Sequence, residues 1–116
     1  MRLLVVEDDP DLNRQLTTAL SDAGYVVDRA FDGEEGHFLG DSEPYDAVVL
    51  DIGLPGVDGY QVARRIKSNP QLAHIRLVAH TGYGSPEDRR RAHEAGFDAH
   101  LVKPAELSDL EAALRG

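Results

Sequence analysis

The regular alternation of short apolar runs with longer amphipathic segments is the feature that most constrains this chain. Five runs rich in Val, Leu and Ile are each short enough to form a strand. These predicted strands are Leu3–Val6, Tyr25–Val27, Ala47–Leu50, Ile75–Ala79 and Ala99–Val102. Three of the runs are apolar throughout, which is typical of strands that are covered on both faces.

Segments of helical length follow each of these runs. They are Asp11–Ala23, Glu34–Ser42, Tyr60–Ser68, Pro86–Ala95 and Glu106–Leu114. The first has apolar residues at helical spacing, with Asp9 as its predicted N-cap and Gly24 as its predicted stop. The second is the weakest helix prediction, since Gly36 and Gly40 each cost about 1 kcal/mol relative to Ala in a helix.

The order of the elements predicts an α/β fold with a parallel sheet and helices on both faces. Five strand–helix units in 116 residues predict a flavodoxin-like (βα)5 sandwich, a doubly wound fold with strand order 2-1-3-4-5. We expect residues 1–116 to form a single domain, with no effector domain present. In such open sheets a binding site lies beyond the carboxyl ends of the strands, where the strand order reverses.

Composition excludes several functional classes. The 12 Lys and Arg against 21 Asp and Glu give a formal net charge of −9, which argues against direct binding of nucleic acid or of an anionic membrane. The chain has no Cys, so disulfides, thiolate catalysis and cysteine zinc sites are excluded. No apolar run is long enough for a membrane span or a signal peptide, and we therefore expect a cytoplasmic protein.

Polar side chains gather at the carboxyl ends of the predicted strands. Glu7 and Asp8 follow the first strand, Asp51 follows the third, Thr81 follows the fourth and Lys103 follows the fifth. If the first and third strands are neighbours, three carboxylates meet in a small volume and repel one another. A hard divalent cation such as Mg²⁺, which takes oxygen ligands, would remove this conflict.

The same edge offers the chemistry of phosphoryl transfer. A cation, the amine of Lys103 and the hydroxyl of Thr81 together match the oxygens of a phosphoryl group, and Gly82 leaves room for its approach. A central carboxylate can itself act as the nucleophile and form an acyl phosphate.

Four stretches of the chain carry a resemblance to a known family. They are Val5–Asp9, Val48–Gly59, Thr81–Gly82 and Ala95–Pro104. In this order and at this spacing, over essentially all 116 residues, the chain resembles the receiver domain of bacterial two-component response regulators.

The resemblance implies a phosphoacceptor and a metal site. Asp51 resembles the residue that accepts a phosphoryl group from a phosphohistidine. Asp8 and Asp51 resemble direct ligands of Mg²⁺ or Mn²⁺, together with the backbone carbonyl of Gly53, whereas Glu7 resembles the acidic neighbour that acts through water.

The resemblance also implies a set of residues that respond to the phosphoryl group. Thr81, with Gly82 beside it, resembles the switch hydroxyl, and Lys103 resembles the lysine that pairs with the phosphoryl oxygens. His100 stands where the family carries a rotating aromatic side chain, and the bond between Lys103 and Pro104 is where the family places a cis peptide.

The function implied is a phosphorylatable signalling switch that is not a turnover enzyme. Its partners would be a histidine kinase or a histidine phosphotransfer protein, and a downstream output domain or protein that reads the surface around the fourth helix and fifth strand. The net charge implies no direct contact with nucleic acid or membrane. Ala99 and Ala113 stand where related transcription-factor receivers carry the opposite charges that drive dimerisation, which implies a monomer or weak dimer.

Three other functions are alternatives to this one. A pseudo-receiver would be an interaction module without phosphorylation, and His80, where the family has an apolar residue, favours it. An aspartate-nucleophile hydrolase would need an acid at Gly53, and a flavin or nucleotide module would need a phosphate loop where Glu7 and Asp8 stand.

The run Arg89–Arg91 fits either a docking patch or a solvated helix face. Tyr83 fits either a shield for the acyl phosphate or a plain surface aromatic.

Overall fold

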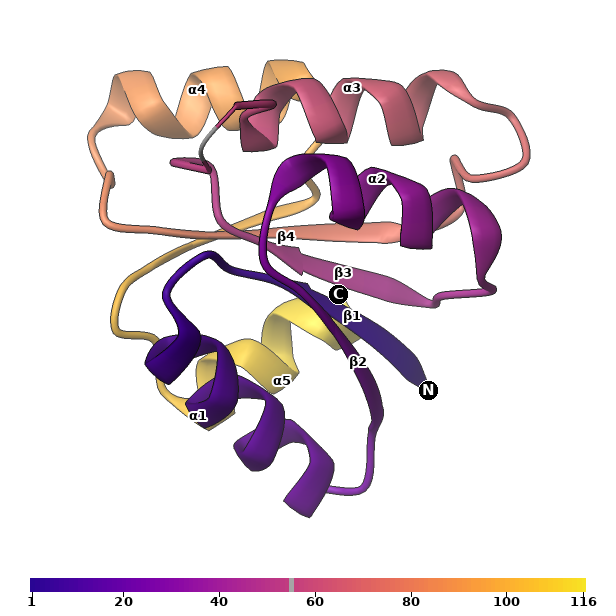
Figure 1. The fold of residues 1–116 in the computed structure, drawn as a ribbon. Coiled ribbons are helices and arrows are strands. Elements are labelled where there is room, and N and C mark those ends of the chain that lie inside the picture. The colour runs from indigo at the N-terminus through magenta and orange to yellow at the C-terminus, as the bar shows by residue number, and fades with distance from the viewer. Residues whose placement is uncertain (55) are drawn as a thin grey trace.

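The structure is a computed structural model that describes residues 1–54 and 56–116, so Pro55, within the stretch 48–59 that carries part of the family resemblance, lies outside the described residues. Strands and helices alternate along the chain, as predicted (Figure 1). The elements are β1 Arg2–Val6, α1 Pro10–Asp22, β2 Val26–Ala30, α2 Gly33–Ser42, β3 Ala47–Leu50, α3 Gly59–Ser68, β4 Arg76–Thr81, α4 Pro86–Ala95, β5 Ala99–Val102 and α5 Leu107–Arg115.

The five strands form one parallel sheet in the order β2-β1-β3-β4-β5, which confirms the predicted flavodoxin-like topology. Helices α2, α3 and α4 cover one face of the sheet, and α1 and α5 cover the other (Figure 1). Strand β1 lies between β2 and β3, with Val6 paired to Leu50 of β3 and to Ala30 of β2. The strand order therefore reverses at β1 and β3, whose carboxyl ends lie side by side.

Two hydrophobic cores hold the layers together. Alternate residues of the central strands enter the core under α2, α3 and α4, where Leu4, Leu50 and Leu77 are fully buried against Ile66. The intervening residues enter the core against α1 and α5. Because β1 and β3 are covered on both faces, residues 3–6 of β1 and all of β3 are apolar instead of alternating.

The predicted cap residues of α1 and the predicted bounds of α4 are confirmed, whereas α1 spans residues 10–22 and not the predicted 11–23. The side chain of Asp9 accepts hydrogen bonds from the backbone N–H groups of Asp11 and Leu12 at the start of α1. Gly24 follows the end of α1 with a φ of 101°, a conformation that favours glycine. Ser85 caps α4, because its hydroxyl oxygen accepts a hydrogen bond from the N–H of Asp88 at 3.1 Å. These local signals act within one helical turn, so they are readable from sequence.

The predicted bounds of two strands are wrong, and local hydrogen bonds explain both errors. The predicted start of β2 at Tyr25 fails because its N–H donates to the carbonyl of Leu20 and closes the end of α1. The strand instead continues through Asp28, which accepts from the hydroxyl of Tyr45 at 2.7 Å. Strand β4 begins after Ile75, whose N–H donates to the carbonyl of Leu72 in a turn, and it ends at Thr81.

Helix α2 forms despite its glycines, and the packing accounts for one of them. A Cβ on Gly36 would lie 2.9 Å from Cγ2 of Val6, so glycine allows α2 to approach β1 closely. A Cβ on Gly40 would meet only an ordinary contact, 3.7 Å from Ile66. Asp32 caps the helix by accepting from the N–H of Glu35 at 2.8 Å, so α2 begins one residue earlier than predicted.

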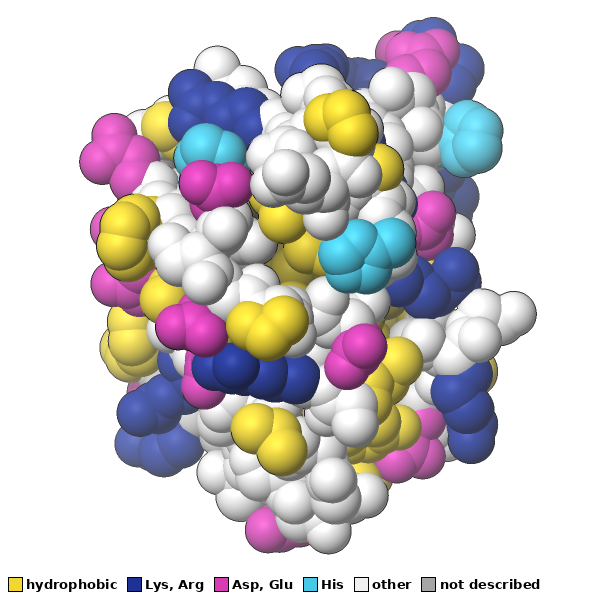
Figure 2. Space-filling model, turned by 90° about the vertical axis from the view of Figure 1, so that its right-hand side faces the viewer, with side chains coloured by type: hydrophobic (Ala, Val, Ile, Leu, Met, Phe, Trp, Pro, Cys, Tyr) yellow, Lys and Arg dark blue, Asp and Glu magenta, His cyan; other side chains and the backbone are white. Residues whose placement is uncertain are grey.

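Charged side chains of both signs are interspersed on the face around the amino ends of the strands, which Figure 2 shows. Here Arg2 pairs with Asp28 at 2.8 Å and with Glu43 at 3.3 Å. Within residues 1–54 and 56–116, the structure contains no helix with the length and apolar character that crossing a membrane requires.

Candidate functional site

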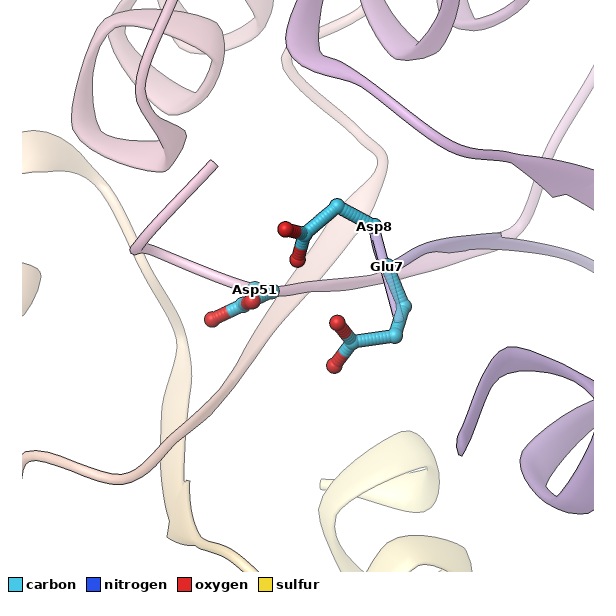
Figure 3. Close-up of side chains that lie close together, drawn as sticks. All are labelled: Glu7, Asp8 and Asp51. Carbon is cyan, nitrogen blue, oxygen red and sulfur yellow. The ribbon is translucent and has the colours of Figure 1, made fainter. Parts of the chain in front are cut away.

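The carboxyl ends of β1 and β3 bring three acidic side chains together. Glu7 and Asp8 directly follow β1, and Asp51 directly follows β3. One carboxylate oxygen from each lies within 4.8 Å of the others, and all three side chains are drawn in Figure 3. Glu7 is 1% exposed and Asp51 6% exposed, whereas Asp8 is open to solvent. The predicted convergence of these three residues is confirmed.

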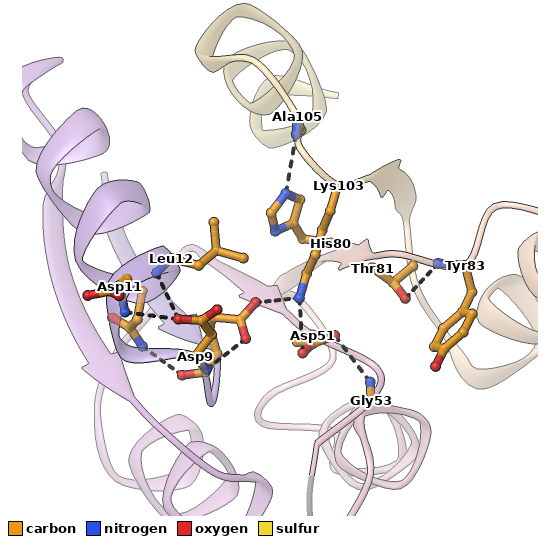
Figure 4. Close-up of polar contacts among 12 residues, drawn as sticks. Asp9, Asp11, Leu12, Asp51, Gly53, His80, Thr81, Tyr83, Lys103 and Ala105 are labelled. Atoms are coloured by element: carbon orange, nitrogen blue, oxygen red, sulfur yellow. Dashed lines mark hydrogen bonds and ion pairs between the residues drawn. The ribbon is translucent and has the colours of Figure 1, made fainter.

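The amine of Lys103 extends from the loop after β5 into this cluster (Figure 4). Its Nζ lies 2.6 Å from Oε1 of Glu7 and 3.2 Å from Oδ2 of Asp51. Burial alone would lower the pKa of Lys103, but its contacts with Glu7 and Asp51 outweigh burial and raise the pKa above its ordinary value. Lys103 is therefore a fixed positive charge at this edge of the sheet.

Burial acts in the opposite direction on Glu7. It raises the pKa of the Glu7 carboxyl, while the contact with Lys103 and the N–H of Asp9 partly offset the increase. That N–H donates to Oε2 of Glu7 at 3.1 Å. The negative charge of Asp51 further disfavours ionisation of Glu7. The two buried carboxylates thus compete for one amine.

The cluster fits a hard divalent cation. Three carboxylates and one ammonium leave two negative charges in a small volume, which a divalent ion would neutralise. All the side-chain donors are oxygens, the ligand type that suits Mg²⁺ and Mn²⁺. Gly53 lies beside them, since its N–H donates to Oδ1 of Asp51 at 3.1 Å. The predicted metal role of its carbonyl stays a prediction.

Thr81 and His100 are connected through the backbone of Tyr83. The buried Oγ1 of Thr81 accepts a hydrogen bond from the N–H of Tyr83 at 3.2 Å (Figure 4). The ring Nε2 of His100 lies 2.8 Å from the carbonyl oxygen of Tyr83. Apart from its chain neighbours Thr81 and Tyr83, no described residue has an atom within 4 Å of a Cβ built on Gly82, so the space at Gly82 is open.

This link between Thr81 and His100 is absent from the sequence prediction. Residues 81 and 100 stand in different strands, and only the pairing of β4 with β5 brings them near each other. The ring of Tyr83 also leans toward the site, because its Cε2 lies 3.9 Å from where a Cβ of Gly53 would stand. Tyr83 is 61% exposed, and its role as a shield stays a prediction.

The remaining predicted features lie outside the acidic cluster. His80 is 1% exposed, and burial, together with the charge of Lys103, lowers its pKa to about 4. In the basic run of α4, Arg90 pairs with Glu87 and Glu94, and Arg91 stacks over the ring of Tyr60 at 4.5 Å. These contacts within the chain favour a solvated helix face over a docking patch.

Comparison with known proteins agrees with this geometry. Residues 3–115 match the family described as the response regulator receiver domain. The chain is 37% identical over 115 residues to the transcriptional regulatory protein HprR of Escherichia coli (strain K12), a match that covers 99% of this chain and 50% of that protein. The chain therefore belongs to the response regulator receiver domain family, and it spans about half the length of curated relatives such as HprR.

Solved structures share the fold over almost the whole chain. The chemotaxis protein CheY4 of Vibrio cholerae superposes with a TM-score of 0.92 at 25% identity, covering 98% of this chain and 95% of that one. The response regulator TrrA of Thermotoga maritima, solved in complex with Mg(2+)-BeF, superposes with a TM-score of 0.87 at 30% identity, covering 98% and 96%. These likenesses confirm the family resemblance and the predicted fold class.

Proposed function

We propose that this receiver domain is a switch of a two-component phosphorelay in which Asp51 accepts a phosphoryl group. The observation that carries the proposal is the position of Asp51, which lies within reach of Lys103 on one side and of Glu7 and Asp8 on the other. An ordinary capping aspartate would have no lysine amine in contact with it and no acidic neighbours around it.

The reaction is a transfer from a phosphohistidine of a histidine kinase or a histidine phosphotransfer protein. A carboxylate oxygen of Asp51 attacks the phosphorus, the P–N bond to the imidazole breaks, and an acyl phosphate forms. Lys103 would pair with the incoming phosphoryl oxygens, and the 3.2 Å distance between its Nζ and Oδ2 of Asp51 supports this role.

Mg²⁺ or Mn²⁺ would be held by Asp8, Asp51 and the carbonyl of Gly53, with Glu7 acting through water. When bound, this cation supplies positive charge to the phosphoryl oxygens in the transition state. The structure of TrrA of Thermotoga maritima in complex with Mg(2+)-BeF supports the metal requirement by likeness. The oxygen-only donor set of this chain supports it directly.

Phosphorylation would change the surface through Thr81. Its hydroxyl now accepts from the N–H of Tyr83, and turning toward the phosphoryl group would end that bond. Tyr83 is also held by His100 at the edge of α4 and β5, so the change would spread to the exposed side chains of Tyr83 and Val102. A downstream output domain or protein would read that surface.

The domain would act as a switch and not as a turnover enzyme. Direct nucleic-acid binding is not expected, since the formal net charge is −9. Cytoplasmic location, the single-domain organisation and a monomeric or weakly dimeric state stay predictions.

Intact mass spectrometry tests the proposal. The protein is incubated with acetyl phosphate, with and without Mg²⁺, alongside Asp51→Asn and the matched control Asp11→Asn, which changes an exposed acid of α1. We expect wild type and Asp11→Asn to gain one phosphoryl group only with Mg²⁺, and Asp51→Asn to gain none. Equal labelling of Asp51→Asn would remove Asp51 from this role, and an unlabelled but folded wild type would support the pseudo-receiver alternative.

A further inference from the structure

The outer edge of β2 has no strand partner among the described residues. This strand lies at one end of the sheet and pairs with β1 alone (Figure 1). The N–H of Val26 and the carbonyl of Ala30 hydrogen-bond to the backbone at the two ends of β1, so both point into the sheet. Successive residues of a strand direct their backbone groups to opposite sides, and Val27 and Arg29 therefore direct theirs outward.

This edge is held in place and only partly protected. Asp28 accepts hydrogen bonds from two side chains of other segments, which fix the strand against β1. The N–H of Phe31, just after the strand, donates to Oε1 of Glu35 at 3.0 Å, which covers the carboxyl end of the edge. The strand contains neither Pro nor Lys, which often protect an edge from pairing. The backbone groups of Val27 and Arg29 are thus available to a further strand.

An open groove of about 630 Å³ lies between this edge and α2. Its apolar wall consists of Phe31 and, from α2, of Phe38 and Leu39. Phe38 is 68% exposed and Phe31 is 40% exposed, whereas Phe97, the third phenylalanine of the chain, is 4% exposed. Two of the three phenylalanines therefore face solvent beside the unpaired edge. A groove of this kind accepts alternate side chains of a strand that is added to a sheet.

The charge of α2 restricts what can occupy the groove. Residues 32–43, which comprise α2 and its caps, contain five acidic residues and no Lys or Arg. Glu35 lines the groove at the beginning of α2, and Asp41 is exposed in its last turn. Neither forms an ion pair with another described residue. The one basic residue of the wall, Arg29, has its guanidinium 5.9 Å from the ring of Phe31.

This charge favours a basic occupant over a second copy of the chain. A segment with Lys or Arg at both ends would complement the acids at the two ends of α2. Two copies joined edge to edge through β2 would instead place two acidic helices side by side, and their like charges would repel.

We propose that the edge of β2 and the groove beside α2 bind an extended segment of a partner protein, which adds a sixth strand to the sheet. Backbone groups of this segment pair with the N–H and C=O groups of Val27 and Arg29. Alternate apolar side chains at its centre contact the apolar wall of the groove, and Lys or Arg at its ends pair with the acids of α2. The proposal does not depend on phosphorylation of Asp51.

Fluorescence anisotropy with a labelled peptide tests the proposal. The probe is a short capped peptide in which Val alternates with Thr between a Lys at each end, and the matched control carries Glu in place of each Lys. We expect the Lys peptide to bind in the micromolar range and roughly tenfold more tightly than the Glu peptide at low salt. The difference should shrink as the ionic strength rises.

N-methylation of the peptide separates edge pairing from simple adhesion. Only every second amide of an added strand faces β2, so methylation of one alternate set should abolish binding and methylation of the other set should be tolerated. Hydrogen exchange followed by NMR should show new protection of the Val27 and Arg29 amides in the complex. The amide of Val26, which already donates to the carbonyl of Met1, should change little.

Variants of the chain locate the site. Phe38→Ala removes an exposed ring from the wall and should weaken the Lys peptide roughly three- to tenfold, whereas Leu107→Ala, at an exposed position of α5, should not. Glu35→Gln keeps an acceptor for the N–H of Phe31 and removes the charge, so it should weaken the Lys peptide and not the Glu peptide. Asp51→Asn should bind as wild type does, which separates this proposal from the proposed phosphorylation.

Several results would overturn the proposal. They are no binding of the Lys peptide, equal binding of the Lys and Glu peptides, equal effects of the two methylated sets, or no protection of the Val27 and Arg29 amides. A wild-type dimer in sedimentation that Phe38→Ala dissociates would also overturn it, because a second copy would then occupy the groove.

Discussion

Nζ of Lys103 lies 2.6 Å from Oε1 of Glu7, although the two residues are separated by most of the chain. This pair joins the end of β1 to the loop after β5, and it spans the carboxyl ends of β3 and β4, which lie between them in the sheet. Because the same amine also contacts Asp51, it offsets only part of the negative charge of two buried carboxylates. The electrostatic imbalance is the reason that the cluster fits a cation.

Neutralising Glu7 should stabilise the protein when no metal is present. Burial raises the pKa of Glu7 in the folded state, so ionisation of Glu7 removes stability as the pH rises through that folded-state pKa. We expect Glu7→Gln to have a higher free energy of unfolding than wild type at pH 7 in a chelator, and the difference to shrink below the ordinary pKa of about 4.3.

Added Mg²⁺ should make wild type more stable than Glu7→Gln, which is the opposite of the order expected in a chelator. Wild type should gain more stability from Mg²⁺ than Glu7→Gln does, because binding to the folded state adds to its stability. Urea unfolding with chelator and with Mg²⁺ measures both effects, and Glu34→Gln, at an exposed position of α2, is the matched control. If Glu7→Gln and Glu34→Gln change the free energy of unfolding by the same amount in chelator and in Mg²⁺, the ionised carboxylate of Glu7 does not destabilise the folded protein.

His80 should make the protein sensitive to acid. Its pKa is about 4 in the folded state, against an ordinary value of 6.5 for histidine, so the unfolded chain binds the proton more tightly. The stability it contributes is fully present above about pH 6.5 and is lost as the pH falls to about 4. The loss amounts to about 3 kcal/mol for a shift of this size.

Unfolding curves between pH 7 and pH 4 measure this loss. We expect His80→Leu to lack this part of the pH dependence, whereas His74→Leu, which changes an exposed histidine, should keep it. If wild type and His80→Leu lose stability in parallel over this range, the buried histidine is not the group that titrates.

Two glycines at helical positions should respond oppositely to the same substitution. A Cβ on Gly59 would lie 2.5 Å from the backbone oxygen of Asp51 and 2.6 Å from Cα of Ile52, neither of which can move without moving the loop after β3. We expect Gly59→Ala to cost roughly 1–3 kcal/mol. Gly40→Ala meets only an ordinary contact and should stabilise α2 by up to about 1 kcal/mol.

Thermal or urea unfolding of both variants measures the difference. Gly59→Ala should also reduce labelling by acetyl phosphate, since it displaces the backbone beside Asp51, while Gly40→Ala should leave labelling unchanged. Equal stability of the two variants would contradict the close approach of α3 to the end of β3.

The sequence was sufficient for the topology and for the acidic cluster because both follow from strand ends. Continuous apolar runs such as Ala47–Leu50 mark buried parallel strands, and polar residues that directly follow them fall at one edge of the sheet. Asp51 and Lys103 could be placed together on this basis alone.

Features that depend on contacts between distant segments could not be predicted. The bounds of β2 were wrong because its polar residue Asp28 is held in the strand by Tyr45 and Arg2, partners that are distant in sequence. The bond from His100 to the carbonyl of Tyr83 arises only from the β4–β5 pairing. Helix propensity alone counted Gly36 as destabilising for α2, but Val6 lies so close to it that the position has no room for a side chain.

The most direct test of the central claim is to identify the residue that carries the phosphoryl group. Borohydride reduces an aspartyl phosphate to homoserine, so peptide mapping after labelling with acetyl phosphate and Mg²⁺ and then reduction reports the acceptor position. We predict homoserine at position 51 and an unmodified aspartate at positions 8 and 9. Homoserine at position 8 or 9, or its absence from the peptide that contains position 51, would contradict this account.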